Sequence, residues 1–458
     1  MAFSIRKGKI IVRNKPERKI RSGFRGDRMS IEERNISRRT FLKGAAALPL
    51  LLGGCSFFPS VKRAADNLTG RCLPGTALLR QLITARPDRS RVFMWQSAAA
   101  QPEATVAVRW RGGSEVQTFP AVSIPYTDDR QQLHLQTVTV DGLQAGTAYD
   151  YQLRHRGESS DWYPFSTAAP GRFKALIFPD TQCNDYSVWA ANAKKATAAH
   201  PDADFFVNMG DLVDNGEDSS QWNAWFDAVQ PLLETRPFVP VMGNHETYDR
   251  RWEVRVPTAY LSQFAVPPNG CDGFDRFFYS FDWGEVHFVV LNTQWDELAS
   301  LRPQLLAAQQ EWLRLDVARS RQRWKVALFH KDVLKYAIKS RPERQAGISG
   351  FGQALAPLLE ELGFDLVLTA HLHTYRNRGR LKAFQPSETG PAYVLTGVAG
   401  NIFYNDFWLD HPLDRKKAPQ PETGNYLTLT AEAGSLHLES FLFSGQRFDE
   451  LYLRKNPR

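Results

Sequence analysis

Residues able to bind metals or transfer protons follow five apolar segments of the sequence. The segments at 172–180, 202–211, 238–246, 324–330 and 364–373 end in Asp180, Gly210-Asp211, Gly243-Asn244-His245-Glu246, His330, and His371 with His373. One such ending alone says little, because a single Asp or His after a strand usually serves as a turn, a cap or a satisfied polar group. Five together favour one site, because the carboxyl ends of parallel strands meet at one edge of a sheet.

The types of these residues indicate transition-metal chemistry. Carboxylates, imidazoles and one amide oxygen suit Fe, Mn or Zn, whereas Ca²⁺ prefers a shell of oxygens only. Two such ions about 3.5–4 Å apart can clamp a phosphoryl group during in-line displacement and acidify a water between them to hydroxide. We therefore expect two metal ions (Fe, Mn or Zn), with Asp211 as the carboxylate that bridges them.

The His pair adds a geometric argument. His371 and His373 flank Leu372. In a strand that continues through this segment, both imidazoles would point to the same face of the sheet.

The segments around these residues predict how they are positioned. Helical patterns at 186–200, 219–234 and 303–317 lie between the apolar runs. Alternating strands and helices favour a mainly parallel sheet. Two further segments, at 277–292 and 425–443, have the pattern of antiparallel strand pairs.

Residues 76–168 have a different sequence pattern. Short alternating strands at 91–96, 105–111, 134–140 and 149–155 are separated by turn residues, which predicts a small β-sandwich. The stretch 143–149 resembles the corner of fibronectin type III domains, where a tyrosine hydroxyl bonds back to the backbone. Tyr149 and Trp95 are accordingly expected in the core.

The five blocks, taken together, resemble those of the calcineurin-like metallophosphoesterases. With the preceding sandwich, the resemblance is to the branch similar to purple acid phosphatases. It implies a fibronectin III-like β-sandwich followed by an α/β domain with a double β-sheet core flanked by helices. It also implies hydrolysis of phosphate esters.

The resemblance implies a role for each residue of the five blocks. Metal one would be held by Asp180, Asp211 and His373, and metal two by Asp211, Asn244, His330 and His371. His245 would orient the phosphate and assist departure of the alkoxide, so His245 and Asp211 are the expected catalytic residues.

Two positions depart from that pattern. Purple acid phosphatases place a tyrosine where this chain has Asp214, and other branches place a histidine where it has Gln182. The amide oxygen of Gln182, or a water that it holds, is the candidate fourth ligand of metal one.

The segment 401–417, rich in aromatic and charged residues, could border the substrate cleft. Tyr404 and Trp408 would then lie on the rim, together with Tyr375 after the His pair. Alternatively, the segment could fold back as a cover, and the sequence leaves both readings open.

Net charge is concentrated in the leader. The chain carries a net +8, but residues 1–55 hold 14 Lys and Arg against 4 Asp and Glu. The remaining body is therefore slightly acidic, which gives no indication of nucleic-acid binding.

The leader itself resembles a twin-arginine export signal at Ser37–Lys43, followed by a short apolar run. This implies export in the folded state by the twin-arginine machinery to a bacterial periplasm or cell surface. Leu52-Gly53-Gly54-Cys55 also resembles a lipobox in which Cys55 would be lipidated. An ordinary cleavage site is the alternative, and contact with a membrane is expected only through the leader or such an anchor.

The expected organisation is a signal at 1–55, a linker at 56–75, the sandwich at 76–168 and the phosphoesterase domain at 170–455. The function predicted is hydrolysis of small phosphate monoesters by attack of a metal-bridging hydroxide. A phosphodiesterase or nucleotidase with the same centre is one alternative. A surface-anchored binding protein with a degenerate metal site is another.

Overall fold

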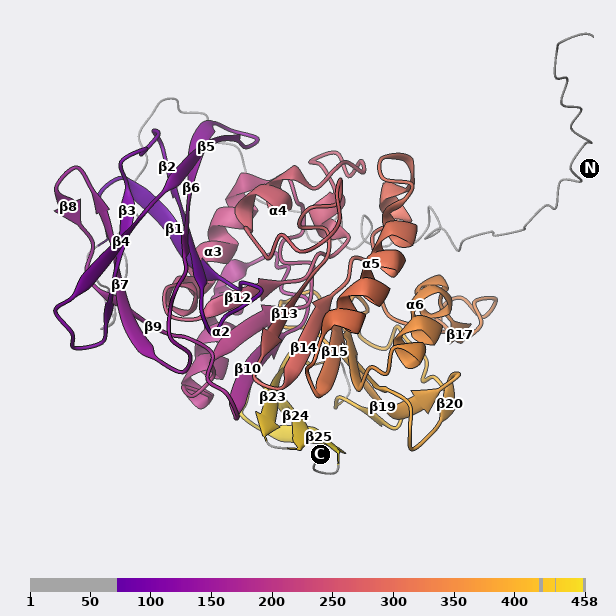
Figure 1. The fold of residues 1–458 in the computed structure, drawn as a ribbon. Helices are drawn as coiled ribbons and strands as arrows, with labels where there is room; N and C mark the ends of the chain where they lie inside the picture. The colour runs from indigo at the N-terminus through magenta and orange to yellow at the C-terminus, as the bar shows by residue number, and fades with distance from the viewer. Residues whose placement is uncertain (1–71, 420–422, 433, 456–458) are drawn as a thin grey trace, which may run out of the picture. The chain divides into compact units, whose positions relative to one another are not determined.

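The computed structural model describes residues 72–419, 423–432 and 434–455 (Figure 1). The expected export signal, Cys55 and most of the expected linker lie outside these residues. No helix in the described part of the chain is both long and apolar enough to cross a membrane.

The largest sheet has ten strands and runs through both domains. In spatial order it contains β25 (Arg447–Arg454), β24 (Ser435–Leu442), β23 (Asn425–Glu432), β10 (Phe173–Phe178), β11 (Phe205–Asn208), β12 (Pro237–Pro240), β1 (Thr76–Leu82), β2 (Arg91–Ser97), β6 (Gln132–Val140) and β5 (Val122–Thr127). Strands β10, β11 and β12 are parallel, so their carboxyl ends lie at one edge.

A second sheet supplies the other half of the phosphoesterase domain. It contains β13 (Tyr279–Trp283), β14 (Val286–Val290), β15 (Trp324–Leu328), β18 (Leu366–Thr369), β21 (Ala392–Thr396), β19 (Tyr375–Lys382) and β20 (Gln385–Pro386), with β22 (Lys416–Lys417) beside β19. Strands β14, β15, β18 and β21 are parallel. Their near-continuous apolar sequences fit burial on both faces.

Helices lie in the connections between the strands of the two sheets. They are α2 (Tyr186–Ala199), α3 (Ser219–Leu233), α4 (Thr258–Gln263), α5 (Leu305–Arg319) and α6 (Gly350–Glu361), with short 3₁₀ helices η1 (His245–Thr247) and η2 (Glu297–Ser300) and the small pair β16 (Leu334–Lys335) and β17 (Gly347–Ile348). Helix α3 buries Trp222, Trp225, Phe226 and Val229, whose spacing forms one helical face. Asp218 caps its first turn by accepting a hydrogen bond from Ser220 N.

The remaining strands complete the N-terminal sandwich. They are β3 (Thr105–Trp110), β4 (Val116–Pro120), β7 (Ala148–His155), β8 (Glu158–Ser159) and β9 (Tyr163–Ser166). Trp95 and Tyr149 are buried between the two sheets of the sandwich, and the Tyr149 hydroxyl accepts a hydrogen bond from Gln144 N at 2.9 Å. Both expectations for this domain are confirmed, as is the fold class of a sandwich followed by an α/β domain.

The two domains share backbone hydrogen bonds, which the sequence did not predict. Strand β1 pairs in parallel with β12, so that Gln81 lies opposite Pro237. The Gln81 side chain and the Tyr151 hydroxyl both donate to the Glu234 carbonyl at the end of α3. The sandwich is therefore a continuation of the phosphoesterase sheet rather than a separate module.

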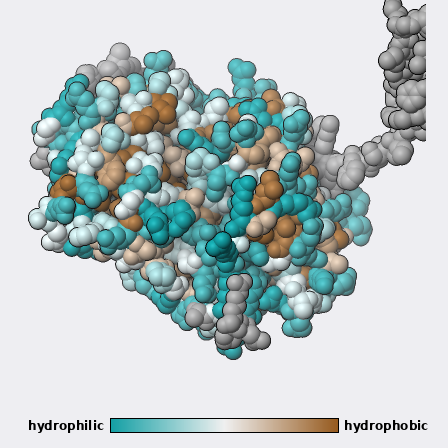
Figure 2. Space-filling model, in the orientation of Figure 1, coloured by the Kyte–Doolittle hydropathy of each residue, from teal (hydrophilic) through white to brown (hydrophobic). Residues whose placement is uncertain are grey.

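Apolar side chains on the surface are scattered. Figure 2 shows brown areas interrupted by teal and white ones on the visible face. Exposed examples from the sandwich are Trp110, Val122 and Ile124. Single exposed apolar residues are ordinary and do not define a binding surface.

His287 on β14 is buried between two carboxylates. Its Nδ1 lies 2.7 Å from Asp282 Oδ1 and its Nε2 lies 3.0 Å from Asp316 Oδ2. Burial alone would lower the pKa of His287, but the hydrogen bonds to these two carboxylates outweigh it and raise the pKa to about 9.

A raised histidine pKa makes stability depend on pH. The stabilisation is complete below the unfolded pKa of about 6.5 and is lost as the pH rises through about 9. We expect the free energy of unfolding, measured by urea titration, to fall by roughly 2–3 kcal/mol between pH 6.5 and 9.5 through this group. His287→Gln should remove that component of the pH dependence, and an unchanged pH profile in the variant would contradict this origin.

Candidate metal centre

The residues of the five sequence blocks meet where the carboxyl ends of parallel strands from both sheets converge. Asp180 follows β10, Asp211 follows β11 and the segment Asn244-His245 follows β12. His330 follows β15, and His371 and His373 follow β18. All of the expected metal-site residues therefore come from one edge of each sheet.

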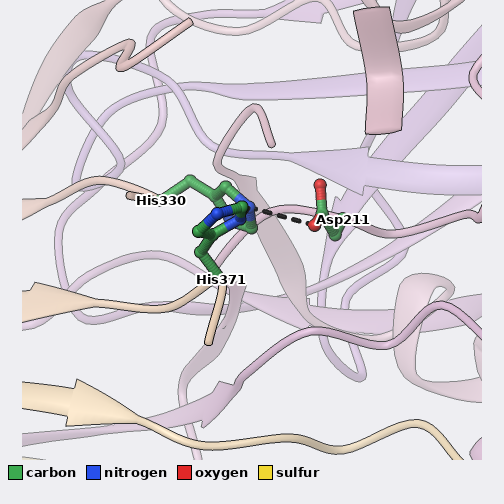
Figure 3. Close-up of side chains that lie close together, drawn as sticks. All are labelled: Asp211, His330 and His371. Carbon is green, nitrogen blue, oxygen red and sulfur yellow. Dashed lines mark hydrogen bonds and ion pairs between the residues drawn. The ribbon is translucent and has the colours of Figure 1, made fainter. Parts of the chain in front are cut away.

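Two clusters of possible ligands form there, and they share one residue. Asp211, His330 and His371 make one cluster (Figure 3), and Asp180, Asp211 and His373 make the other. Within each cluster the nearest ligand atoms lie within 4.8 Å of one another. Asp211 belongs to both, which is the position of a carboxylate that bridges two ions.

The surroundings of His330 fit a cation better than a proton. Its Nδ1 lies 3.0 Å from the Met209 carbonyl, which fixes that nitrogen as the proton donor. Its Nε2 then faces three acceptors: Asp211 Oδ2 at 3.0 Å, Asn244 Oδ1 at 3.1 Å and His371 Nδ1 at 3.2 Å. A single proton on Nε2 could satisfy only one of them, whereas a metal ion binds several lone pairs at once.

The second cluster also contains acceptor atoms that no donor among the described residues satisfies. His373 Nδ1 lies 2.6 Å from the Ile402 carbonyl, so its Nε2 faces Asp180 Oδ2 at 3.0 Å as an acceptor. Asp180 Oδ2 is buried and has no hydrogen-bond partner among the described residues. A buried carboxylate oxygen without a donor is costly, and a bound cation would supply what it lacks.

The carboxylates and imidazoles of the two clusters shift one another's pKa values. Burial opposes ionisation of Asp211, yet the nearby imidazoles of His330 and His245 hold its pKa below the usual range. Burial likewise opposes protonation of His330, but the Asp211 and Asp180 carboxylates raise its pKa to about 9. Burial and the neighbouring His330 lower the pKa of His371, which leaves it neutral and able to ligate.

Three of the expected ligands have left-handed backbone conformations. The φ angles are +50° at Asp211, +79° at His371 and +50° at His373. Non-glycine residues rarely adopt this region, and it costs of order 1 kcal/mol or more each, so the clustering marks a functional site. The strand expected to carry the His pair in fact ends at Thr369. That prediction is wrong, and a left-handed turn, not strand alternation, directs both imidazoles inward.

Two glycines make room for the ligands. A Cβ on Gly210 would lie 2.6 Å from His330 Nδ1, and a Cβ on Gly243 would overlap the Asp211 carboxylate. Glycine is needed at both positions, because any side chain would displace a ligand.

Glu246 holds the two loops that carry these residues. Its carboxylate accepts hydrogen bonds from three backbone amides, Asp211 N at 3.0 Å, Leu212 N at 2.8 Å and Gly243 N at 2.7 Å. These contacts hold the strained backbone at Asp211, and Glu246 belongs to neither ligand cluster.

His245 lies beside the clusters and belongs to neither. Its Nδ1 lies 2.7 Å from the Asp214 carbonyl, so that nitrogen is the donor and Nε2 points into the site, 3.9 Å from Asp211 Oδ2. Two aromatic residues pack edge-on against the ring, Tyr248 and Trp252, with centroid distances of 5.8 Å and 5.7 Å.

Gln182 contacts His245 with its amide nitrogen. Gln182 Nε2 lies 3.2 Å from His245 Nε2. The amide oxygen is buried and has no hydrogen-bond partner among the described residues. After Asp180 Oδ2, it is the second buried oxygen on this loop that has no hydrogen-bond partner among the described residues.

The segment 401–417 packs against the His pair. The Tyr404 ring is tilted against the His373 ring at a centroid distance of 4.7 Å, and Trp408 Nε1 donates to the Leu372 carbonyl at 2.8 Å. Both side chains are half-buried. The segment thus supports the turn between His371 and His373 and contributes an aromatic ring beside His373.

Tyr375 does not lie on the rim. It is 1% exposed, and its hydroxyl donates to Asp449 Oδ2 at 2.7 Å, towards the C-terminal hairpin. The sequence prediction failed because Tyr375 opens strand β19, where its side chain enters the core.

Sequence reasoning also missed contributors to the site. The carbonyls of Asp214, Met209 and Ile402 fix histidine tautomers, but backbone groups leave no sequence signal. Trp252 beside His245 occurs in a loop without any motif, and its left-handed φ of +64° is visible only in the structure.

Comparison with known families agrees with this geometry. Residues 173–375 match the calcineurin-like phosphoesterase family, and residues 79–167 match the N-terminal domain of purple acid phosphatases. Over residues 173–375 the chain is similar to calcineurin-like metallophosphoesterases. A dinuclear metal site is typical of that family, and the Asp and His clusters of this chain include the groups for one.

Individual relatives are similar over parts of their length. Purple acid phosphatase 15 of Arabidopsis thaliana is 31% identical over 206 residues, which cover 44% of this chain and only 36% of that relative. Probable purple acid phosphatase 20 of the same plant is 23% identical over 77% of this chain and 79% of its own length. The structure of purple acid phosphatase PPD1 from yellow lupin (Lupinus luteus) seeds has the same fold, with a TM-score of 0.68 at 18% identity, over 83% of this chain and 74% of that one.

The role of Glu246 can be tested through metal affinity. Glu246→Gln places an amide group against backbone N–H donors and should loosen the loops that carry Asp211 and Asn244. We expect metal affinity to fall roughly 10- to 100-fold, measured as metal content after dialysis against a weak chelator. Glu253→Gln, at an exposed position of a nearby loop, should retain metal like the wild type. Equal retention by both variants would contradict the supporting role.

Proposed function

We propose that this protein hydrolyses small phosphate monoesters at a dinuclear metal centre. The observation that carries the proposal is the pair of ligand clusters sharing Asp211. The family match to calcineurin-like phosphoesterases supports it.

Each side chain has an assigned place in the proposed centre. Asp180, Asp211 and His373 would hold metal one, with Gln182 as a further oxygen ligand, and Asp211, Asn244, His330 and His371 would hold metal two. The metals would be Fe, Mn or Zn, given imidazole, carboxylate and amide donors. When bound, they would act as Lewis acids that polarise the phosphoryl oxygens and activate water.

His245 would handle the proton of the leaving group. The Asp214 carbonyl holds Nδ1, and Nε2, which accepts from the Gln182 amide nitrogen in the neutral ring, would take up a proton and pass it to an alkoxide that departs from phosphorus. Burial works against the charged imidazole, but the carboxylates of Asp211 and Asp214 outweigh it and raise the pKa of His245. A raised pKa suits a general acid.

Export is a further part of the proposal. It is supported by the twin-arginine pattern at Ser37–Lys43, with Cys55 as the candidate lipidation site at the end of the apolar run. The protein would then act in the periplasm or at the cell surface. Fractionation of cells that produce the wild type or Arg38→Lys/Arg39→Lys is the measurement for this proposal, and unchanged export of the variant would contradict it.

Activity of the purified protein tests the proposed chemistry. With Mn, Fe or Zn, the wild type should release phosphate from an aryl monoester faster than it cleaves the bis-aryl diester. Asp211→Asn should lower the rate by roughly 100- to 1,000-fold, because the bridging charge is lost. Asp185→Asn is the matched control, because Asp185 only caps helix α2. Inactivity of the wild type on both esters with every metal would refute the proposal, and preference for the diester would favour a phosphodiesterase.

Metal analysis tests the ligand role of Gln182. Gln182→His supplies an imidazole near metal one and should tighten that ion roughly tenfold, whereas Gln182→Leu should loosen it. Titration with Mn²⁺ followed by calorimetry measures both. Identical affinities in the wild type and both variants would show that Gln182 is not a ligand. Absence of bound metal in the wild type would instead favour a binding protein with a degenerate site.

A further inference from the structure

The N-terminal sandwich reaches the His245 side of the metal centre through the hairpin between β5 and β6. Asp128 Oδ1 accepts hydrogen bonds from Arg130 N and Gln131 N, both at 2.7 Å, and so stabilises the tip. Both of these hydrogen bonds of Asp128 lie within the turn. Its neighbour Asp129 instead projects away from the hairpin.

Asp129 is a buried carboxylate with both oxygens bound to the phosphoesterase domain. Its side chain is only 5% exposed. Oδ1 accepts from Ser219 N at 3.0 Å, at the start of helix α3, and Oδ2 accepts from Arg250 Nη1 at 3.0 Å. Burial works against its charge, but the hydrogen bonds from Ser219 and the charge of Arg250 outweigh it and lower the pKa of Asp129.

Arg250 belongs to the small loop that borders His245. Asp249 Oδ1 organises this loop by accepting from Arg251 N and Glu253 N, both at 2.8 Å. Trp252, in its left-handed conformation, then packs edge-on against the His245 ring. A shift of Arg250 would move the loop and with it the aromatic wall beside His245.

Ser219 is also connected to His245 through a second series of contacts, which runs along helix α3 and Gly216. It begins helix α3, whose Trp222 Nε1 donates to the Gly216 carbonyl at 3.0 Å. Gly216 N in turn donates to the His245 carbonyl at 2.9 Å. Asp129 therefore joins the two segments that contact His245.

The structure assigns to Asp129 the role of a positioning residue through which the sandwich domain fixes the place of His245. The assignment rests on the proposed function only for the chemical role of His245. The sandwich thereby helps to position the residue that would protonate the leaving group.

This role makes a specific kinetic prediction. An alkyl phosphate needs a proton on its departing oxygen, whereas a 4-nitrophenolate leaves with little help. A displaced His245 should therefore slow the alkyl ester more than the nitrophenyl ester. A general loss of folding would slow both equally.

The test compares Asp129→Asn, Asp129→Ala and Asp129→Glu with the wild type, all loaded with Mn²⁺. For the first two variants, we expect kcat for glycerol phosphate to fall about tenfold and kcat for 4-nitrophenyl phosphate to fall less than about threefold. Asp129→Glu should recover part of the loss. Asp150→Asn is the matched control, because Asp150 pairs with Arg109 and Arg111 inside the sandwich, and it should match the wild type.

Hydrogen–deuterium exchange provides a readout that does not depend on activity. In Asp129→Asn and in Arg250→Met, amides of the segment 245–254 should exchange several-fold faster, while those of α5 stay unchanged. The double variant should add little to either single one, because both break the same contact.

Unchanged exchange in the segment 245–254, or equal losses for the two esters, would overturn the assignment. A wild type inactive on both esters would count against the proposed function instead, and the exchange measurement would still decide whether Asp129 positions His245.

Discussion

Two buried carboxylates, Asp180 and Asp211, lie among imidazoles whose free nitrogens point at them and at each other. Such a cluster is stable only if positive charge fills it, and one proton cannot serve all its lone pairs. Much of the surrounding structure meets this constraint. Backbone carbonyls orient the histidines, glycines clear the space, and Glu246 binds the amides of both loops. The cost of the left-handed backbone at Asp211 is offset by those contacts.

The sequence predicted the fold and the members of the cluster because both follow simple rules. Apolar runs mark parallel strands, and polar residues at their carboxyl ends must gather, so Asp211 and His330 could be paired across the chain. The sequence failed where contacts depend on the backbone or on loops. The carbonyls of Asp214 and Ile402 have no signature, and the turn at His371 looks like a strand.

The side of metal one is the part of the site that depends most on loops. Its expected ligands are flanked by Gln182, with a free amide oxygen, and by Tyr404, whose ring packs against His373. Burial, together with the nearby carboxylates, raises the pKa of Tyr404, so its hydroxyl stays protonated without a metal. In the proposed centre, neither Gln182 nor Tyr404 would therefore add negative charge to the ligands of metal one.

The parallel pairing of β1 with β12 has a consequence for how the chain folds. Gln81 meets Pro237 only after about 150 further residues have been synthesised, so the central sheet closes through a contact of high sequence separation. Until then the edge of β1 that faces β12 stays unpaired, although its other edge can already pair with β2. Assembly of the two domains should therefore be one late and slow cooperative event, in which the chain is most exposed to mispairing with other copies.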